Sequence, residues 1–130
     1  VHAGWRGVMS HIAVRALEAL RAGGSELRTV RAAIGPCIQR CCFEVDGDLP
    51  ARFEAAFGPE VLASGGPRVR VDLAEALRRT LEGEGIPPAQ IEVLGACTAC
   101  DPRFFSHRRD RGRTGRHLSF ITCPGSASFS

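Results

Sequence analysis

Residues 2–7, with the sequence His-Ala-Gly-Trp-Arg-Gly, combine residue types that can bind an anion or a metal ion. The two glycines flank Trp5 and Arg6 and would let a ligand approach the backbone closely. A helix is expected to begin directly after this segment, and the free N–H groups at its N-terminus would attract an anion. His2 is a candidate metal ligand or catalytic residue, and a hydrogen-bonded structural role is the alternative.

A cluster of arginines near the C-terminus is the second group that could carry chemistry. Its members lie between positions 103 and 116: Arg103, Arg108, Arg109, Arg111, Arg113 and Arg116. Asp101 and Asp110 are the acidic residues beside them. The cluster indicates either a solvated loop or a binding site for an anionic group. Nucleic acid is a weaker interpretation, because Phe104 and Phe105 are adjacent rather than interleaved with the arginines.

The cysteines are the third group, and they are Cys37, Cys41, Cys42, Cys97, Cys100 and Cys123. No segment has the pattern of a secretion signal, so we expect thiols or metal ligands rather than disulfides. The C-x-x-C pair at 97–100 and two thiolates from residues 37–42 would make a four-thiolate zinc site. The first group follows a Gly-Pro turn and precedes an apolar segment, unlike the short knuckle of a zinc ribbon, which favours buried thiols in the core instead. A nucleophilic Cys37 would need a nearby base, which the sequence does not indicate.

Apolar periodicity predicts the helices that would position these groups. Residues 8–22 repeat apolar side chains at three- and four-residue steps, and two glycines follow them. Residues 48–57 are expected to form a second helix, with Asp48 as its N-cap. A third helix is expected to begin at Asp72, where Glu75 three residues later indicates a capping box.

Strands are predicted where β-branched and apolar residues alternate or run together. The predicted strands are residues 29–34, 68–71, 91–96 and 117–122. Helices and strands therefore alternate along the chain. This order predicts an α+β fold, a layered α/β sandwich with a mixed β-sheet flanked by helices.

The composition fits one domain of ordinary size. The chain has 130 residues, of which 44% are hydrophobic and 24% charged, and its apolar runs are too short for a transmembrane helix. All 17 basic residues are arginine, which indicates a coding bias, and the net charge of +3 is too small to indicate nucleic acid. The first residue is Val1. We expect residues 1–123 to form one intracellular domain lacking its N-terminal portion, and residues 124–130 to form a frayed tail.

Four motifs occur together in an order that resembles one family. They are residues 2–7 (His-Ala-Gly-Trp-Arg-Gly), 33–38 (Ala-Ile-Gly-Pro-Cys-Ile) with 41–45 (Cys-Cys-Phe-Glu-Val), 97–98 (Cys-Thr), and 104–110 (Phe-Phe-Ser-His-Arg-Arg-Asp) with 115–116 (Gly-Arg). Over about residues 1–122 the chain resembles the C-terminal half of the YfiH/LACC1 family. These proteins were formerly described as multicopper polyphenol oxidases or laccase-domain proteins.

The resemblance implies a YfiH-like fold and a cytoplasmic purine nucleoside phosphorylase. Such an enzyme cleaves adenosine, inosine, guanosine or methylthioadenosine with phosphate, and it also deaminates adenosine. The resemblance further implies a His-Cys-His metal site, with zinc expected rather than copper. His2 would be its last ligand, and the other two are expected upstream of Val1. Purine nucleoside and phosphate are the expected partners, without nucleic acid or membrane, and a homodimer is left open.

Phosphorolysis would need an anion site and a proton donor, and the sequence offers candidates for both. We assign catalytic roles to His2, Arg6 and His107, and phosphate binding to Arg6, Arg108 and Arg109. A guanidinium can form two parallel hydrogen bonds to a phosphate, which favours arginine at such a site. Ion pairs between Arg108, Arg109 and neighbouring carboxylates are the alternative.

Two further function classes remain open at this point. One is a non-catalytic, truncated relative, and the other is a structural, cysteine-rich zinc-binding module. Copper-dependent oxidation of phenols is disfavoured because it needs several histidine-rich sites. The chain has only four histidines, scattered at positions 2, 11, 107 and 117.

Overall fold

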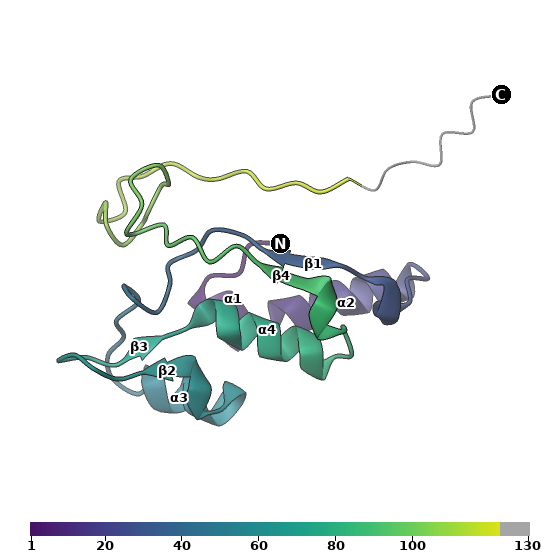
Figure 1. The fold of residues 1–130 in the computed structure, drawn as a ribbon, viewed down its shortest axis with the longest axis horizontal. Helices are drawn as coiled ribbons and strands as arrows, with labels where there is room; N and C mark the ends of the chain where they lie inside the picture. Colours follow the sequence, from purple (N-terminus) through teal and green to yellow (C-terminus); the bar gives the residue numbers. More distant parts are fainter. Residues whose placement is uncertain (123–130) are drawn as a thin grey trace.

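Helices and short strands alternate in the computed structural model, which describes residues 1–122 (Figure 1). The helices are α1 (Trp5–Met9), α2 (Ile12–Ala22), α3 (Leu49–Phe57) and α4 (Leu73–Gly83). The strands are β1 (Ala32–Ile34), β2 (Leu62–Ala63), β3 (Arg70–Val71) and β4 (Ile91–Val93). Single 3-10 turns at Leu27–Thr29, Pro59–Val61 and Pro88–Gln90 connect them. The α+β fold class predicted from the sequence is confirmed.

The strands pair in both directions, as expected of a mixed arrangement, but in two separate sheets. Strands β1 and β4 are parallel, with Ala32 opposite Ile91 and Ile34 opposite Val93. Strands β2 and β3 are antiparallel, with Leu62 opposite Val71. The predicted strands at 29–34, 68–71 and 91–96 are present in shortened form.

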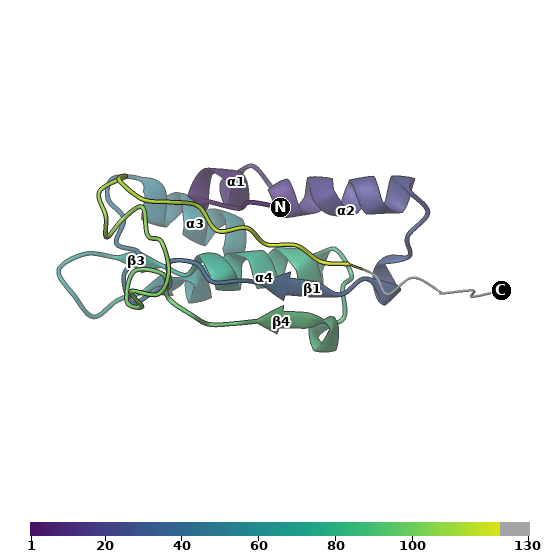
Figure 2. The same ribbon diagram turned by 90° about the horizontal axis from the view of Figure 1, so that it is seen from above.

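Helix α4 is the central element, because it contacts both strands of the parallel pair and the other three α-helices named above. Figure 1 shows α2 and α4 on one side of β1 and β4, and in Figure 2 α4 lies between α2 and β4. The buried residues between these elements are Leu17, Ile34, Ala74, Leu81 and Ile86. A second buried cluster joins α3, the antiparallel pair and the start of α4. Its members are Val8, Phe43, Val45, Phe53, Phe57, Val61, Val71, Leu73 and Ala76.

The helix predicted over residues 8–22 is two helices, which is a correction to the sequence analysis. Helix α1 begins at Trp5, within the segment expected to precede the helix. His11 then interrupts the helical path, with φ 54° and ψ 42° in the left-handed region. The break turns Val8 into the cluster around α3 and Leu17 into the cluster beneath β1 and β4. A single straight helix has one apolar face, so it could not direct Val8 into one buried cluster and Leu17 into the other as this pair of helices does.

The strand predicted over residues 117–122 is wrong. None of the described strands pairs with this segment, which runs as an extended arm away from the loop before it (Figure 1). Leu118, Phe120 and Ile121 are 88%, 84% and 82% exposed. Alternating apolar residues form a half-buried strand only where a neighbouring strand and a core are at hand. The predicted frayed tail at 124–130 and Cys123 lie outside the described residues.

The capping box predicted at the start of α4 forms only in part. The carboxylate of Asp72 accepts a hydrogen bond from the backbone N–H of Glu75 at 3.0 Å, as expected of an N-cap. The backbone N–H of Asp72 donates to the carbonyl of Val61 at 2.8 Å instead of to Glu75. The Glu75 carboxylate accepts from Arg78 and Arg79. Within residues 1–122, no helix combines the length and apolarity that crossing a bilayer requires.

Candidate functional site

The N-terminal segment forms a shallow, open depression of about 220 Å³, lined by His2, Gly4, Trp5, Arg6 and Gly7. A Cβ on Gly4 would lie 3.4 Å from Nε2 of His2, and a Cβ on Gly7 would lie 3.4 Å from Ile12. The glycines therefore let this segment pack closely on itself and on α2. This adds a packing role to the ligand access predicted from the sequence.

Arg6 lies over the indole ring of Trp5, with its guanidinium carbon 4.6 Å from the ring centroid. This is the geometry of a cation–π interaction, which orders the side chain without using its N–H donors. Within residues 1–122 no hydrogen bond or ion pair engages the Arg6 side chain, which is exposed. Arg6 therefore presents an oriented positive charge with its donors available to an anion.

A second open depression of about 240 Å³ adjoins the first, and Trp5 lines both. Its other lining residues are Phe43, Glu44, Val45, Asp46, Leu49, Arg68 and Arg108. Arg108 reaches this depression from the arginine cluster. Its Nη1 donates to the carbonyl of Glu44 at 3.0 Å, and its guanidinium carbon lies 5.3 Å from the Phe43 ring centroid.

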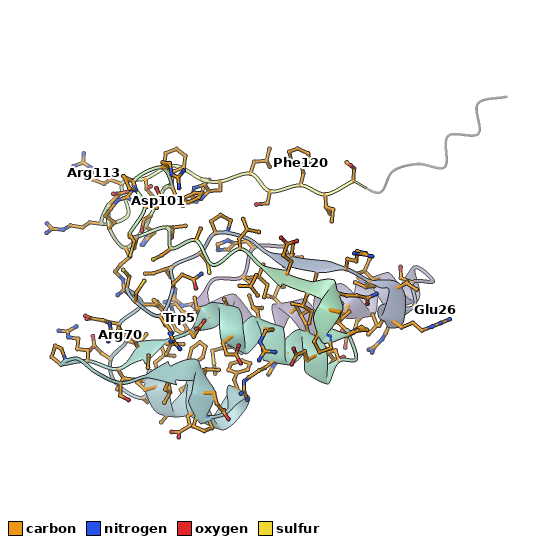
Figure 3. The ribbon with its side chains drawn as sticks, viewed as in Figure 1. Trp5, Glu26, Arg70, Asp101, Arg113 and Phe120 are labelled. Carbon is orange, nitrogen blue, oxygen red and sulfur yellow. The ribbon has the colours of Figure 1, made fainter. Side chains whose placement is uncertain are left out.

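Trp5 thus lines two depressions, and each of them is also lined by one of the predicted phosphate-binding arginines. Figure 3 shows Trp5 toward the end of the molecule where Arg70 lies, far from Glu26 at the opposite end. Arg6 and Arg108 come from segments about a hundred residues apart, and the shared lining residue brings them to one region. Whether these arginines bind an anion stays a prediction.

Arg109 is used differently from Arg108. Its Nη1 donates to the carbonyls of Thr98 and Asp101 at 3.1 and 3.2 Å. Its Nη2 donates to the carbonyl of Phe104 at 2.8 Å and to Asp110 at 3.0 Å, and its Nε donates to Asp110 at 2.8 Å. A guanidinium has five N–H donors, and these bonds use all of them. This geometry favours the alternative interpretation of ion pairing, with Arg109 holding the loop rather than binding phosphate.

Asp110 is one of the acidic residues named beside the arginine cluster, and its role in organising the loop was not predicted from the sequence. Besides its ion pair with Arg109, its Oδ2 accepts from the Ser106 backbone N–H at 3.3 Å and from the Thr114 hydroxyl at 3.1 Å. The hydrogen bond from Arg109 is the main reason that the pKa of Asp110 is lowered. The short Ser-x-x-x-Asp spacing is the signal that could have indicated such a turn.

His107 lies on the same loop and is exposed. Its carbonyl accepts from the N–H of Gly112, and a Cβ on that glycine would lie 3.4 Å from His107 Nε2. Gly112 has φ 81°, which a glycine adopts without strain, so the loop closes tightly against the imidazole. Unlike Arg6 and Arg108, His107 lines neither depression.

Asp101 anchors another arginine of the cluster. Its carboxylate accepts from Nε and Nη2 of Arg103 at 3.0 and 2.6 Å, a two-point pair. These bonds lower the pKa of Asp101 to about 2. Figure 3 shows Asp101 and Arg113 on the same loop, apart from the helical part of the molecule.

Four cysteines lie together at the base of this loop, which differs from the buried thiols favoured by the sequence analysis. They are Cys41, Cys42, Cys97 and Cys100, and their Sγ atoms lie within 4.8 Å of one another, close enough to hold a metal ion. Cys41 and Cys100 are exposed. Burial raises the pKa of the Cys97 thiol, but backbone N–H groups of Gln39, Cys100 and Ala99 outweigh it, so that the pKa is about 6.

Cys37 is not a member of this group. Its Sγ accepts a hydrogen bond from Nε2 of Gln39 at 3.0 Å. Burial, followed by the nearby charge of Asp72, raises the pKa of this thiol to about 11. A thiol that resists deprotonation is a poor nucleophile, in agreement with the interpretation that Cys37 is not catalytic.

His2 does not by itself fit the metal site that the family resemblance implies. A catalytic zinc ion needs three protein ligands and an open position. Among residues 1–122, the cysteine cluster is the group of three or more metal-ligating side chains, and no histidine belongs to it. The described residues therefore offer His2 as one ligand without companions.

The comparisons with known proteins define the class. A family model described as multi-copper polyphenol oxidoreductase laccase matches residues 1–124, so the chain belongs to this family. A solved structure, that of the hypothetical protein YfiH from Bacillus licheniformis, superposes with a TM-score of 0.80 at 38% identity. The match covers 88% of this chain and 45% of that chain. The YfiH/LACC1 resemblance and the fold expected from it are both confirmed.

Curated relatives carry the name of an enzyme. A purine nucleoside phosphorylase of Deinococcus radiodurans is 40% identical over 95% of this chain and 47% of its own length. The purine nucleoside phosphorylase LACC1 of Mus musculus is 33% identical over 93% of this chain and 30% of its own length. The chain therefore spans less than half the length of these relatives.

Proposed function

We propose that this chain forms part of a purine nucleoside phosphorylase that uses its Trp5 region to bind phosphate beside the nucleoside. The observation that carries the proposal is that Arg6 lies over the Trp5 ring, while Trp5 and Arg108 line the same depression. The names of relatives 33–40% identical to the chain support it. The substrate class is the purine nucleosides, namely adenosine, inosine, guanosine and methylthioadenosine, and the proposed compartment is the cytoplasm.

The reaction places clear demands on the residues. A phosphate oxygen forms a bond to C1′ of the ribose while the bond between C1′ and the purine nitrogen breaks. The electron pair of that bond leaves with the base, which takes up a proton, and the products are ribose 1-phosphate and free purine. Arg6 and Arg108 are proposed to hold the phosphate and offset its charge. His107 is proposed to supply or orient a proton, and Arg109 to hold the loop that carries Arg108.

Zinc and adenosine deaminase activity belong to the same proposal. Deamination replaces the amino group of adenosine with oxygen from water and releases ammonia. We propose that His2 is one ligand of a catalytic zinc ion whose remaining ligands come from outside the described residues. No step is assigned to that metal, because His2 alone cannot hold it with an open position.

The test uses the complete protein encoded by the gene that contains this chain. Each of the four nucleosides is incubated with and without inorganic phosphate, and free base and ribose 1-phosphate are quantified by chromatography. We expect base release that depends on phosphate. Conversion of adenosine to inosine without phosphate measures the deaminase. Absence of phosphate-dependent base release from all four nucleosides would overturn the proposed phosphorylase.

Variants separate the proposed phosphate contacts from the rest of the arginine cluster. Arg6→Ala and Arg108→Ala are each expected to raise the phosphate KM by about tenfold or more, because a charged hydrogen bond to the anion is lost. Arg113→Ala removes an arginine of the same cluster whose side chain makes no hydrogen bond or ion pair within residues 1–122, and it is expected to leave the phosphate KM unchanged. Equal effects of all three variants would contradict the assignment.

A further inference from the structure

The cysteine cluster at the ends of the parallel strands carries an inference separate from the proposed enzyme activity. We propose that Cys41, Cys42, Cys97 and Cys100 bind one zinc ion as a structural site with four thiolate ligands. Four protein ligands leave no open position, so the ion would stabilise the fold and would not take part in the reaction.

The spacing of the sulfur atoms suits a tetrahedral ion. Sγ of Cys100 lies 3.5 Å from Sγ of Cys41 and 3.3 Å from Sγ of Cys42, and all four sulfur atoms lie within 4.8 Å of one another. A zinc ion with bonds of about 2.3 Å to sulfur separates its ligands by about 3.8 Å, which lies inside this range. A disulfide would need about 2.05 Å between the sulfur atoms, and these cysteines are free.

The backbone brings the two pairs of cysteines together before any metal is considered. The parallel pairing of β1 and β4 continues past the strands as a bridge between Cys37 and Cys97. The N–H of Cys37 donates to the carbonyl of Ala96 at 3.2 Å, and the N–H of Thr98 donates to the carbonyl of Cys37 at 3.0 Å. The loops that carry the ligands are therefore already fixed side by side, which lowers the entropic cost of assembling the site.

One backbone N–H group beside the cluster is placed to orient a ligating sulfur atom, and an arginine holds the backbone of another ligand. The backbone N–H of Gln39 points at Sγ of Cys97 at 3.5 Å, and Nη1 of Arg70 donates to the carbonyl of Cys41 at 3.4 Å. Hydrogen bonds to a ligating sulfur orient it and stabilise its negative charge. Thiolate is a soft ligand, and four thiolates in a tetrahedral arrangement select zinc over magnesium or calcium.

The proposed ion would hold the base of the arginine cluster in place. Cys97 and Cys100 immediately precede the loop on which Arg108 and Arg109 lie, and Arg109 bonds to the carbonyls of Thr98 and Asp101 within and beside the C-x-x-C turn. Linking this turn to residues 41 and 42 would fix it to the loop that follows β1. The zinc would thus position the arginine loop without touching a substrate.

The experiment measures zinc in the chain itself, purified under reducing conditions from zinc-supplemented medium and passed through a desalting column. Elemental analysis is expected to give about one zinc per chain. Replacing zinc with cobalt is expected to produce the near-ultraviolet sulfur-to-cobalt charge-transfer band of a tetrahedral thiolate site. Cys97→Ser and Cys42→Ser are expected to weaken zinc binding by ~100-fold or more, because each removes a ligand.

Two matched controls distinguish this site from its neighbours. Cys37→Ser changes a fifth cysteine in the same loops that lies outside the cluster, and it is expected to keep the zinc. His2→Ala is also expected to keep it, so the result is independent of any metal at the N-terminal segment. Neither measurement requires nucleoside or phosphate, so a failed phosphorylase assay would leave this test intact.

Several results would overturn the proposal. These are zinc near background in the unaltered chain, a disulfide among the four cysteines in the reduced preparation, or equal zinc loss in Cys37→Ser and Cys97→Ser. If the serine variants fail to fold, the cobalt spectrum of the unaltered chain decides. A charge-transfer band with the intensity of four thiolates supports the site, and a spectrum without that band contradicts it.

Discussion

Arg109 illustrates how one residue type serves two purposes in this chain. Arg108 and Arg109 are adjacent in sequence, yet the first lines the depression beside Trp5 and the second donates its hydrogen bonds to its own loop and to Thr98 in the C-x-x-C turn. A lysine at position 109 would keep the charge but could not match the planar fork of donors. The loop conformation should therefore depend on arginine at this position.

We expect Arg109→Lys to loosen the loop over residues 101–114. Losing several hydrogen bonds, two of them to a carboxylate, should speed hydrogen exchange in this loop by about tenfold. Mass spectrometry of exchanged peptides measures this directly. Arg113→Lys is the control and should leave exchange unchanged. Unaltered protection in Arg109→Lys would mean that the five bonds do not hold the loop.

Glu75 gives the chain a defined response to acid. The hydrogen bond from Arg78 lowers the pKa of the Glu75 carboxylate most. Burial raises this pKa in part, and the hydrogen bond from Arg79 lowers it further, so that the pKa falls from 4.5 to about 2. A carboxyl group whose pKa is lower in the folded state stabilises the fold when it is ionised. That contribution is present above about pH 4.5 and is lost as the pH falls toward about 2.

We expect Glu75→Gln to lower the free energy of unfolding at pH 7 by about 1 kcal/mol, because a partly exposed ion-pair network on a helix contributes about that much. The difference between the variant and the unaltered chain should shrink below pH 4.5 and vanish near pH 2. Urea unfolding followed by circular dichroism at a series of pH values measures it. Glu18→Gln, on an exposed helix face, should show no such pH dependence. A constant difference across the series would contradict the ion-pair assignment.

The N-termini of α3 and α4 both have an aspartate at the N-cap position, but only one of the two side chains makes the capping hydrogen bond. Asp72 caps α4 with a side-chain hydrogen bond, whereas Asp48 occupies the equivalent position of α3 without one. Asp48 itself has φ −84° and ψ −6°, a helical conformation, so its side chain is not set to reach back as a cap does.

We therefore expect the same substitution to have different effects at the two positions. Asp72→Ala should lower the free energy of unfolding by about 1 kcal/mol, and Asp48→Ala should change it by less than about 0.5 kcal/mol. Chemical unfolding of both variants under one set of conditions provides the comparison. Equal losses would indicate that the Asp48 carboxylate caps α3 in solution.

Elements with local signals could be predicted from the sequence, and elements that depend on distant partners could not. Helix α4 was predicted because Asp72 and its leucine repeat specify a helix within a dozen residues. The break at His11 was missed because neither glycine nor proline stands between residues 8 and 14 to signal it. The left-handed residue lets Val8 and Leu17 reach two separate buried clusters. Residues 117–122 alternate between apolar and polar side chains as a half-buried strand does. The segment is nevertheless exposed, because no described strand lies beside it, and the alternation alone does not reveal whether such a strand is present.

In the candidate site, too, residue types could be predicted from the sequence, whereas contacts between distant segments could not. Arg6 and Arg108 could be chosen as candidate anion ligands from residue type, but the sequence could not predict that each lines a depression shared with Trp5. The structural role of Arg109 depends on which carbonyls surround it, and the sequence does not encode that directly. The cysteine cluster required the register of β1 and β4, which brings residues 41 and 42 to the C-x-x-C turn.

At the scale of the whole molecule, two phenylalanines have opposite environments. Phe53 is fully buried beside Phe57, with ring centroids 5.5 Å apart, and Phe120 is 84% exposed on the extended arm. The contribution of an aromatic side chain to stability comes from the surface it removes from water and from close packing. The arm therefore adds little to the stability of the described fold.

We expect Phe53→Ala to lower the free energy of unfolding by about 3–5 kcal/mol, and Phe120→Ala to change it by less than about 0.5 kcal/mol. Thermal and urea unfolding measure both. Phe120→Ala should also reduce self-association of the chain in sedimentation experiments, because it removes exposed apolar surface. A large loss of stability in Phe120→Ala would show that the arm packs on the domain in solution.

The parallel pairing of β1 with β4 has a consequence for how the chain folds. Strands β2 and β3 are separated by a short loop and can meet early, together with α3 and α4 on either side of them. Strand β1 must instead wait for residues 91–93, and closing that long loop carries an entropic cost before any contact repays it. The order of events we expect is a nucleus at α3, β2, β3 and α4, with the sheet that aligns the cysteines closing last.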